Sequence, residues 1–293
     1  MSKRKGPAAI FVNEGAGSAH SPRVKSAVAL ARRALDADLH VTATRVPEEL
    51  RAFLDERLGG YQTVVMAGGD GSLGVAFNAA AGRDVTLGYI PAGFGNATAH
   101  LLRLPRHPAA LAGLLAGGEA RSTDLVAVDG RLALFAGAGW DALVARRYAE
   151  AGARRLRGWA SAILSSLPDL MQRHVVRVEV DGAPAYEGPL TLLVASTTPH
   201  YGRGLLVNPG ARPDRGQMTA RIYPGPLARQ AIESVRWLAH RRPSAPGIQA
   251  TSVTLTSLDG RQVPVQADGD AVGEALVWQF ELRVAAVRLI GRW

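Results

Sequence analysis

Two stretches decide the fold of this chain: Thr63-Val64-Val65-Met66-Ala67-Gly68-Gly69-Asp70-Gly71-Ser72 and Leu87-Gly88-Tyr89-Ile90-Pro91-Ala92-Gly93-Phe94-Gly95-Asn96. Each is a short apolar run that ends in a glycine-rich loop, a pattern typical of buried strands. The spacing predicts a helix over Leu73 to Ala81, and this helix would make the two strands parallel. The expected apolar face of the helix is Leu73, Ala76, Phe77 and Ala80. Both loops should therefore open at the edge of the sheet where α/β folds bind ligands.

The residue types in these loops suit a phosphate ligand. Glycine allows positive φ and close approach of backbone N–H groups to an anion. Ser72 is expected to cap the following helix, whose N-terminus also favours an anion. Asp70 would repel phosphates unless a cation lay between them, which points to Mg²⁺. The plainer alternative is that Gly69-Asp70-Gly71 is a tight turn.

The composition limits the class of protein. With 293 residues, 47% of them hydrophobic, the chain can bury a large core and is long enough for two domains. No apolar run approaches the length of a membrane span, and the N-terminus has no signal-peptide pattern, so we expect a cytoplasmic location. Cysteine is absent, which excludes disulfides, thiolate metal sites and a cysteine nucleophile.

The charged residues limit the groups that could bind an anion. Lysine occurs only at positions 3, 5 and 25, which excludes a Walker-type lysine after the glycine loop. Any phosphate must be bound by backbone N–H groups, arginine and metal. The net charge of +9 favours nucleic acid, an acidic membrane surface or a phosphorylated substrate as partner. A GC-rich genome that encodes arginine freely would explain the charge equally well.

The two loops carry a family resemblance. Gly68–Ser72 resembles the GGDGT/S signature of the diacylglycerol kinase catalytic-domain family, which includes sphingosine kinases and bacterial lipid kinases and is related to NAD kinases. Pro91–Asn96 resembles its second signature, P-x-G-T-x-N-D, although Phe94 replaces the usual Thr and Ala97 the frequent Asp. The loop Asn13–Ser18 resembles the N-P-x-[AS]-G turn of the family. The resemblance implies a set of nucleotide-binding residues: Asn13, Gly17, Thr44, Gly68, Gly69, Asp70, Gly71, Ser72, Gly93, Phe94 and Asn96.

The second half of the chain has a sequence pattern typical of β-strands. Two strands flank Asp129-Gly130, a strong hairpin signal, and further Asp-Gly turns follow. We therefore expect a Rossmann-like α/β nucleotide-binding domain over residues 1–121. An antiparallel β-sandwich lipid or substrate domain with inserted helices should occupy residues 122–293, and its last segment could return to the first domain.

Two helices are expected within this β region. Residues 142–174 place arginines beside Trp159 and an apolar stripe, which fits either an acidic membrane surface or, as we favour, an ordinary amphipathic helix with a core-facing stripe. Residues 227–242 should form a helix with inward-facing apolar side chains: Ile232, Val235, Leu238 and Ala239.

Four further segments resemble the family. Phe135–Ala142 is similar to its N-x-x-G-x-G-F-D-A segment, and His200–Gly204 to its Y-x-G-G segment. Ala211–Met218 resembles A-x-x-D-D-G-x-[LM], with Asp214 as a candidate metal ligand, Arg215 in place of the second Asp and Thr219 in place of the final acid. Val263–Asp270 resembles Q-x-D-G-E and places Asp270 at the proton acceptor, one methylene shorter than the usual Glu.

The resemblance implies an ATP- and Mg²⁺-dependent lipid kinase that phosphorylates a lipid hydroxyl in a cleft between the two domains. Asp270 would act as base, and Asp70 would take part in catalysis and bind the metal, with Asp214 as a candidate ligand of a structural metal. The expected partners are a nucleotide and a lipid at the inner face of the membrane, without nucleic acid; a homodimer is left open. The alternatives are a catalytically impaired binding member, a kinase for a soluble acceptor, and a dinucleotide-binding oxidoreductase, although no G-x-G-x-x-G joins a strand to a helix here.

Overall fold

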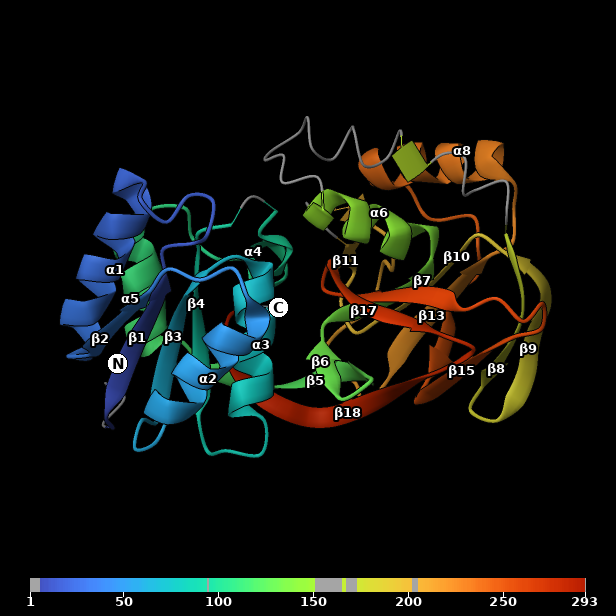
Figure 1. The fold of residues 1–293 in the computed structure, drawn as a ribbon. Coiled ribbons are helices and arrows are strands. Elements are labelled where there is room, and N and C mark those ends of the chain that lie inside the picture. The colour runs from blue at the N-terminus through green and yellow to red at the C-terminus, as the bar shows by residue number, and fades with distance from the viewer. Residues whose placement is uncertain (1–5, 94, 151–164, 167–172, 202–204, 293) are drawn as a thin grey trace. The chain divides into compact units, whose positions relative to one another are not determined.

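The computed structural model describes residues 6–93, 95–150, 165–166, 173–201 and 205–292 and divides the chain into two compact units (Figure 1). The described residues of the first unit run to Thr123 and resume at Ala285, and those of the second lie between Asp124 and Val284. The first unit is an α/β domain and the second is built mainly of antiparallel strands. The predicted fold class is confirmed.

The first unit is built on a parallel sheet. Its strands lie in the order β2-β1-β3-β4-β18, with bounds β1 Ala8–Asn13, β2 Asp38–Thr42, β3 Thr63–Gly68, β4 Thr86–Pro91 and β18 Val277–Ile290. The helices are α1 Pro22–Leu35, α2 Pro47–Arg57, α3 Asp70–Ala80, α4 Ala97–Leu101 and α5 Pro108–Gly117. Helices α1 and α5 pack on one another, as do α2 and α3, and the two pairs cover opposite faces (Figure 1). Every residue of β1 and β3 is buried, which explains their continuous apolar sequences.

Local sequence chemistry sets both ends of α1. Ser21 caps α1, accepting a hydrogen bond from Val24 N at 3.3 Å, and α1 ends at Leu35 because Asp36 adopts φ 51°. Helix α3 starts at Asp70, three residues before the prediction, with Gly69 as its N-cap. The prediction that Ser72 caps this helix is wrong, because Ser72 lies inside its first turn. The predicted buried face of α3 is confirmed.

The second unit contains two antiparallel sheets. One has the order β18-β15-β8-β9, and the other β14-β13-β10-β7-β16-β17. The bounds are β7 Phe135–Gly139, β8 His174–Val180, β9 Ala183–Leu190, β10 Leu192–Ser196, β13 Met218–Tyr223, β14 Ile248–Ala250, β15 Ser252–Ser257, β16 Val263–Ala267 and β17 Asp270–Ala275. A core cluster takes side chains from both sheets. Strand β18 pairs with β15 through Val277–Glu281 and with β4 through Arg288 and Leu289.

Asp-Gly turns join neighbouring antiparallel strands. Asp129 and Gly130 adopt φ 47° and 72° between β5 (Ala120–Val128) and β6 (Arg131–Ala133). Asp268 and Gly269, with φ 50° and 92°, join β16 to β17 in the same way. Positive φ at both central residues gives the turn twist that matches the strands. Two further short strands, β11 (His200–Tyr201) and β12 (Leu205–Leu206), pair with one another.

Two helices of the second unit differ from the predictions. Helix α6 (Trp140–Glu150) covers the start of the predicted 142–174 helix, and β8 already begins at His174. Arg154, Arg155, Arg157, Trp159 and the whole of the predicted stripe lie outside the described residues. Helix α8 spans Leu227–Leu238. None of the helices that the structure describes is long and apolar enough to cross a membrane.

The predicted orientation of α8 is wrong. Ile232, Val235 and Leu238 are 62%, 64% and 68% exposed, and Ala239 is exposed too. Among the α8 side chains that the structure describes, residues 229–238, the buried ones are Gln230, Glu233 and Trp237. Periodicity shows that a helix has two faces but not which face points inward, and here the packing of Trp237 decides.

Candidate functional site

The carboxyl ends of β1, β3 and β4 bring three predicted loops together in the first unit. Ala92 N donates to Gly68 O at 2.7 Å, which joins the two glycine-rich loops. Asn13 Nδ2 donates to Ser72 Oγ at 3.1 Å, and Ser18 donates to Ala92 O through both N (2.8 Å) and Oγ (2.9 Å). The sequence predicted this convergence from the parallel order of the strands.

The contact between the two glycine loops requires glycine. A Cβ atom on Gly93 would lie 2.6 Å from Gly69 Cα and 3.0 Å from Asn96 Oδ1. Asn96, at φ 46°, holds its loop: its Oδ1 accepts from Gly93 N at 2.9 Å and from Tyr89 OH at 3.1 Å, and its Nδ2 donates to Gly93 O at 2.8 Å. At Gly69 and Gly93 the two loops therefore meet backbone to backbone. Phe94 lies outside the described residues.

Asp70 connects the first glycine loop to the helix after the second. Its Oδ2 accepts from Ala97 N at 2.9 Å and its Oδ1 from Thr98 N at 3.1 Å, so this carboxylate caps α4. Burial raises the pKa of Asp70, and the hydrogen bonds from Ala97 and Thr98 oppose that rise. The Thr98 side chain donates a third hydrogen bond to this carboxylate. Because an ionised carboxylate has about four lone-pair sites, room for a cation is left beside these three hydrogen bonds.

The start of α3 is suited to an anion. Its N-cap is Gly69, and no side chain caps it. The first N–H groups of a helix have no acceptor within the helix, and the helix dipole adds partial positive charge there. Three of the predicted residues, Asp70, Gly71 and Ser72, form this first turn. The geometry therefore fits phosphate oxygens at this edge of the sheet.

Thr44 and Gly17 are placed less directly. The Thr44 hydroxyl donates to Glu49 and accepts from Val46 N at 3.1 Å, so it holds the entry to α2. A Cβ atom on Gly15 would clash with the Thr44 carbonyl oxygen, while one on Gly17 would meet nothing within 4 Å. The loop after β1 thus packs against the Thr44 backbone, and the nucleotide contacts of Thr44 and Gly17 remain predictions.

The surroundings of Asp214 do not fit a metal ion. Arg212 takes both of its oxygens, with Nε–Oδ1 at 2.9 Å and Nη2–Oδ2 at 2.7 Å. The nearby Asp124 carboxylate accepts from Gly216 N at 2.7 Å. Within the described part of the chain, no group of three or more His, Asp or Glu side chains could hold a metal ion. The arginine already supplies the positive charge that a cation would bring.

Asp270 lies in the second unit, exposed at the start of β17. The Asp268-Gly269 turn before it is fixed by side chains. The Asp268 carboxylate accepts from Leu134 N at 3.0 Å and from Phe135 N at 3.1 Å, and Gln266 Oε1 accepts from Gly269 N at 2.7 Å. The turn therefore presents Asp270 from a rigid base.

Next to this turn lies a buried acid, Asp141, for which the sequence analysis predicts no role. The Asp141 carboxylate accepts hydrogen bonds from Tyr201 OH and from Gln266 Nε2, the latter at 3.0 Å. Burial raises the pKa of Asp141 to about 6, while the hydrogen bonds from Tyr201 and Gln266 oppose the rise. Gln266 also donates to Tyr201, so one carboxamide connects Asp141 to the turn before Asp270. The sequence feature that could have pointed to Asp141 is its position as the acid among the small residues of Phe135–Ala142.

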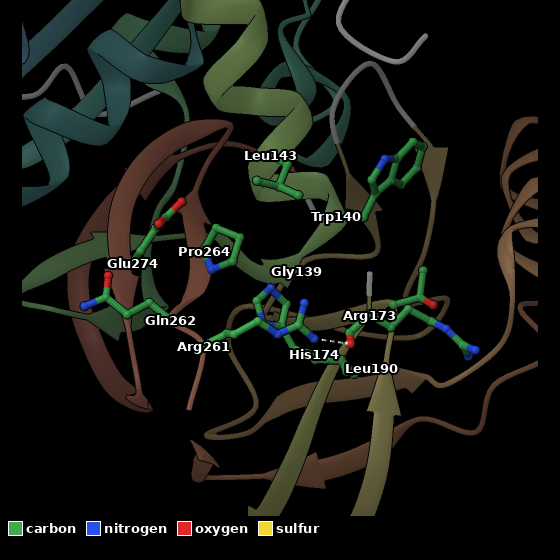
Figure 2. A pocket seen from close by; sticks show the side chains of 11 residues that line it. Gly139, Trp140, Leu143, Arg173, His174, Leu190, Arg261, Gln262, Pro264 and Glu274 are labelled. Carbon is green, nitrogen blue, oxygen red and sulfur yellow. Dashed lines mark hydrogen bonds between the residues drawn. The ribbon is translucent and has the colours of Figure 1, made fainter. Parts of the chain in front are cut away.

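The second unit also contains a pocket of about 280 Å³. Figure 2 shows Trp140 and Leu143 on the α6 side and Arg261 and His174 on the other. Arg261 donates to the Arg173 carbonyl at 2.6 Å, and burial together with the Arg261 charge lowers the pKa of His174. None of the predicted site residues lines this pocket.

The comparisons with known proteins agree with the two-part fold. Residues 7–128 match the diacylglycerol kinase catalytic domain, and residues 135–291 match the YegS C-terminal NAD kinase beta sandwich-like domain. A Pseudomonas aeruginosa protein described as "Probable lipid kinase YegS-like" is 33% identical over 214 residues, covering 71% of this chain and 70% of its own length. A Mycobacterium tuberculosis protein described as "Diacylglycerol kinase" is 32% identical over 164 residues, about half of each chain (52%).

A solved structure shows the same fold. It is a crystal structure from Bacillus anthracis str. Sterne of a protein provisionally described as a diacylglycerol kinase. Its TM-score is 0.78 at 19% identity, and the match covers 99% of this chain and 97% of the other.

Proposed function

The chain belongs to the diacylglycerol kinase family, with a YegS-like C-terminal domain, and we propose that it transfers the γ-phosphoryl group of ATP to the hydroxyl of a diacylglycerol or related lipid. The family makes it a phosphotransferase with an alcohol group as acceptor. The observation that carries the proposal is the close backbone contact between the loops at Gly69 and Gly93 beside the start of α3.

The first unit would hold the nucleotide. Backbone N–H groups of the first turn of α3 would bind phosphate oxygens, and the space left by glycine lets the phosphates approach the backbone. Asn96 and Asp70 would keep the loops in place before the nucleotide arrives, because both already bind backbone groups of the second loop and of α4. Preorganised donors of this kind stabilise the charge that develops on the transferred group.

Magnesium would come with the nucleotide. Asp70 is the carboxylate at this edge that would hold it, and bound Mg²⁺ would neutralise charge on the phosphate oxygens. Such ions are commonly held by one or two carboxylates with the phosphates as further ligands. One acid at the loop is therefore enough, and we include no metal at Asp214.

The second unit would supply the base. Asp270 would accept the proton of the attacking lipid hydroxyl, a role in which a positioned carboxylate contributes about 10² to 10⁴ in rate. Its rigid turn, fixed through Asp268 and Gln266, would offset part of the shorter reach of Asp compared with Glu. The interdomain cleft of the sequence prediction stays a prediction.

The test is phosphoryl transfer from labelled ATP in mixed micelles, with Mg²⁺ or with EDTA. Diacylglycerol, monoacylglycerol, sphingosine, phosphatidylglycerol and NAD are offered separately. The wild type is compared with Asp70→Asn and Asp270→Asn, and with Asp84→Asn as control. Asp84 is an exposed acid paired with Arg288 at the surface, so its loss should leave the rate unchanged.

We expect labelled lipid product to form only when Mg²⁺ is present. The rate of its formation should fall at least 100-fold in Asp270→Asn. Product from NAD alone would favour a soluble acceptor. ATP binding without product from any acceptor would identify an impaired binding protein. Full activity in Asp270→Asn would refute its role as base.

A further inference from the structure

Helix α8 carries an apolar stripe on its outer side. Ile232, Val235 and Leu238 are three residues apart, so they line up along one face, and each is more than 60% exposed. Ala231 and Ala239 are exposed beside them. Figure 1 draws α8 at the outer side of the second unit.

The inner side of α8 is fixed. The Trp237 ring packs edge-on against Tyr223, with 5.5 Å between ring centroids, in a cluster with Leu192 and Val194 of β10. The buried Glu233 carboxylate accepts from Ser244 N through both oxygens at 3.1 Å. Turning the helix to bury its apolar stripe would break both sets of contacts. The exposed stripe is thus the stable orientation.

The charges around the stripe are positive. Arg229, Arg241 and Arg242 are exposed, and the Arg236 side chain is 38% exposed. Glu233, the acid in residues 227–242, is buried and lies 3.5 Å from Arg236. The chain as a whole carries +9. A face with an apolar centre and a basic rim matches the boundary between acyl chains and anionic headgroups.

We infer that α8 is the surface through which the protein docks on a bilayer that contains anionic lipids. The inference rests on the lipid acceptor of the proposed function, because a kinase whose acceptor stays in the bilayer must reach that surface. A second copy of the chain fits less well, since pairing the α8 faces would bring arginines together. Nucleic acid would bind the arginines and leave the Ile, Val and Leu side chains without a partner.

The experiment measures binding of the full chain to vesicles without nucleotide, by flotation. Vesicles of phosphatidylcholine are compared with vesicles that contain about 30% phosphatidylglycerol. The variant Ile232→Gln/Val235→Gln/Leu238→Gln removes the stripe, and Arg241→Gln/Arg242→Gln removes part of the rim. The matched control Val41→Thr/Val277→Thr/Val284→Thr changes three exposed apolar side chains outside α8. Thermal unfolding verifies that each variant is folded.

We expect binding to the anionic vesicles that high salt weakens. The stripe variant should bind at least about tenfold more weakly, and the rim variant should lose about fivefold per arginine. The control should bind like the wild type. Equal losses in the control and the stripe variant, or no binding by the folded wild type, would overturn the inference. A wild-type dimer that the stripe variant converts to monomer would assign the face to a second copy instead.

The docking surface and the proposed reaction are tested by different assays, so one can be refuted without the other. The flotation assay contains no nucleotide, so an inactive protein that still docks through α8 refutes the proposed reaction and leaves the docking surface standing. A protein that phosphorylates lipid in micelles but does not bind vesicles refutes the docking surface alone.

Discussion

Replacing Asp141 by Asn should change how stability depends on pH. Asp141 is buried, and its pKa in the folded protein is about 6 against 3.8 for the free side chain. The folded state therefore binds a proton more tightly than the unfolded chain. Above pH 6 the buried carboxylate is charged and costs stability, and this cost disappears as the pH falls from 6 towards 3.8.

The size of the effect follows from the shift. A rise of about two units corresponds to about 3 kcal/mol, at 1.36 kcal/mol per unit. In Asp141→Asn the side chain has no charge, so the free energy of unfolding lacks this pH-dependent contribution. The variant loses part of the hydrogen bonding from Tyr201 and Gln266, but it does so at every pH. Relative to the variant, the wild type should gain about 2–3 kcal/mol between pH 8 and pH 4.

The assay is urea unfolding at a series of pH values, with the difference in free energy of unfolding between wild type and Asp141→Asn plotted against pH. Tyr201→Phe is the companion variant. Because the Tyr201 hydroxyl lowers the pKa of Asp141, its removal should move the transition to higher pH. A difference that stays flat from pH 4 to pH 8 would refute the assignment of a buried, proton-binding Asp141.

Three further predictions concern the first unit and the Asp214 turn. Gly93→Ala places a Cβ against backbone, so it should lower the free energy of unfolding by about 1–3 kcal/mol and weaken ATP binding in calorimetry. The control Gly113→Ala, with open space around it, should bind ATP like the wild type. Equal ATP affinities of the two variants would contradict the tight loop contact. Asp70→Asn turns an amide NH₂ towards a backbone N–H of α4, so that two donors face one another. The variant should lower the free energy of unfolding by about 1–3 kcal/mol. An unchanged urea midpoint would show that the cap is unimportant. Because Arg212 pairs with Asp214, EDTA should leave the thermal midpoint of the protein unchanged, and a clear drop would show a structural metal after all.

The convergence of the loops after β1, β3 and β4 could be predicted from the sequence because its signals are local. The apolar runs before Gly68 and Pro91 define buried strands, and a connecting helix forces them to be parallel. Their loops then meet at one edge, as Ala92 and Gly68 do. The Asp129-Gly130 turn was equally readable, since positive φ at both positions is a local demand.

The surroundings of Asp141 depend on contacts between distant residues. Burial raises the pKa of Asp141, and the hydrogen bonds that oppose this rise come from Tyr201 and Gln266, which are far from it in sequence. Nothing in the run Phe135–Ala142 shows whether its acid is buried or exposed. The role of Asp70 as a cap for α4 likewise needs the fold, because Ala97 and Thr98 follow the second loop.

The sequence by itself determined the class of fold and the family, because periodicity, glycine loops and Asp-Gly turns are properties of short segments. It also determined that α8 has two faces. The tertiary structure alone decided which face points outward, because that choice depends on where Trp237 and Glu233 find partners in Tyr223 and Ser244. An amphipathic pattern has the same period whether its apolar side meets a protein core or a bilayer, so the direction is set by packing.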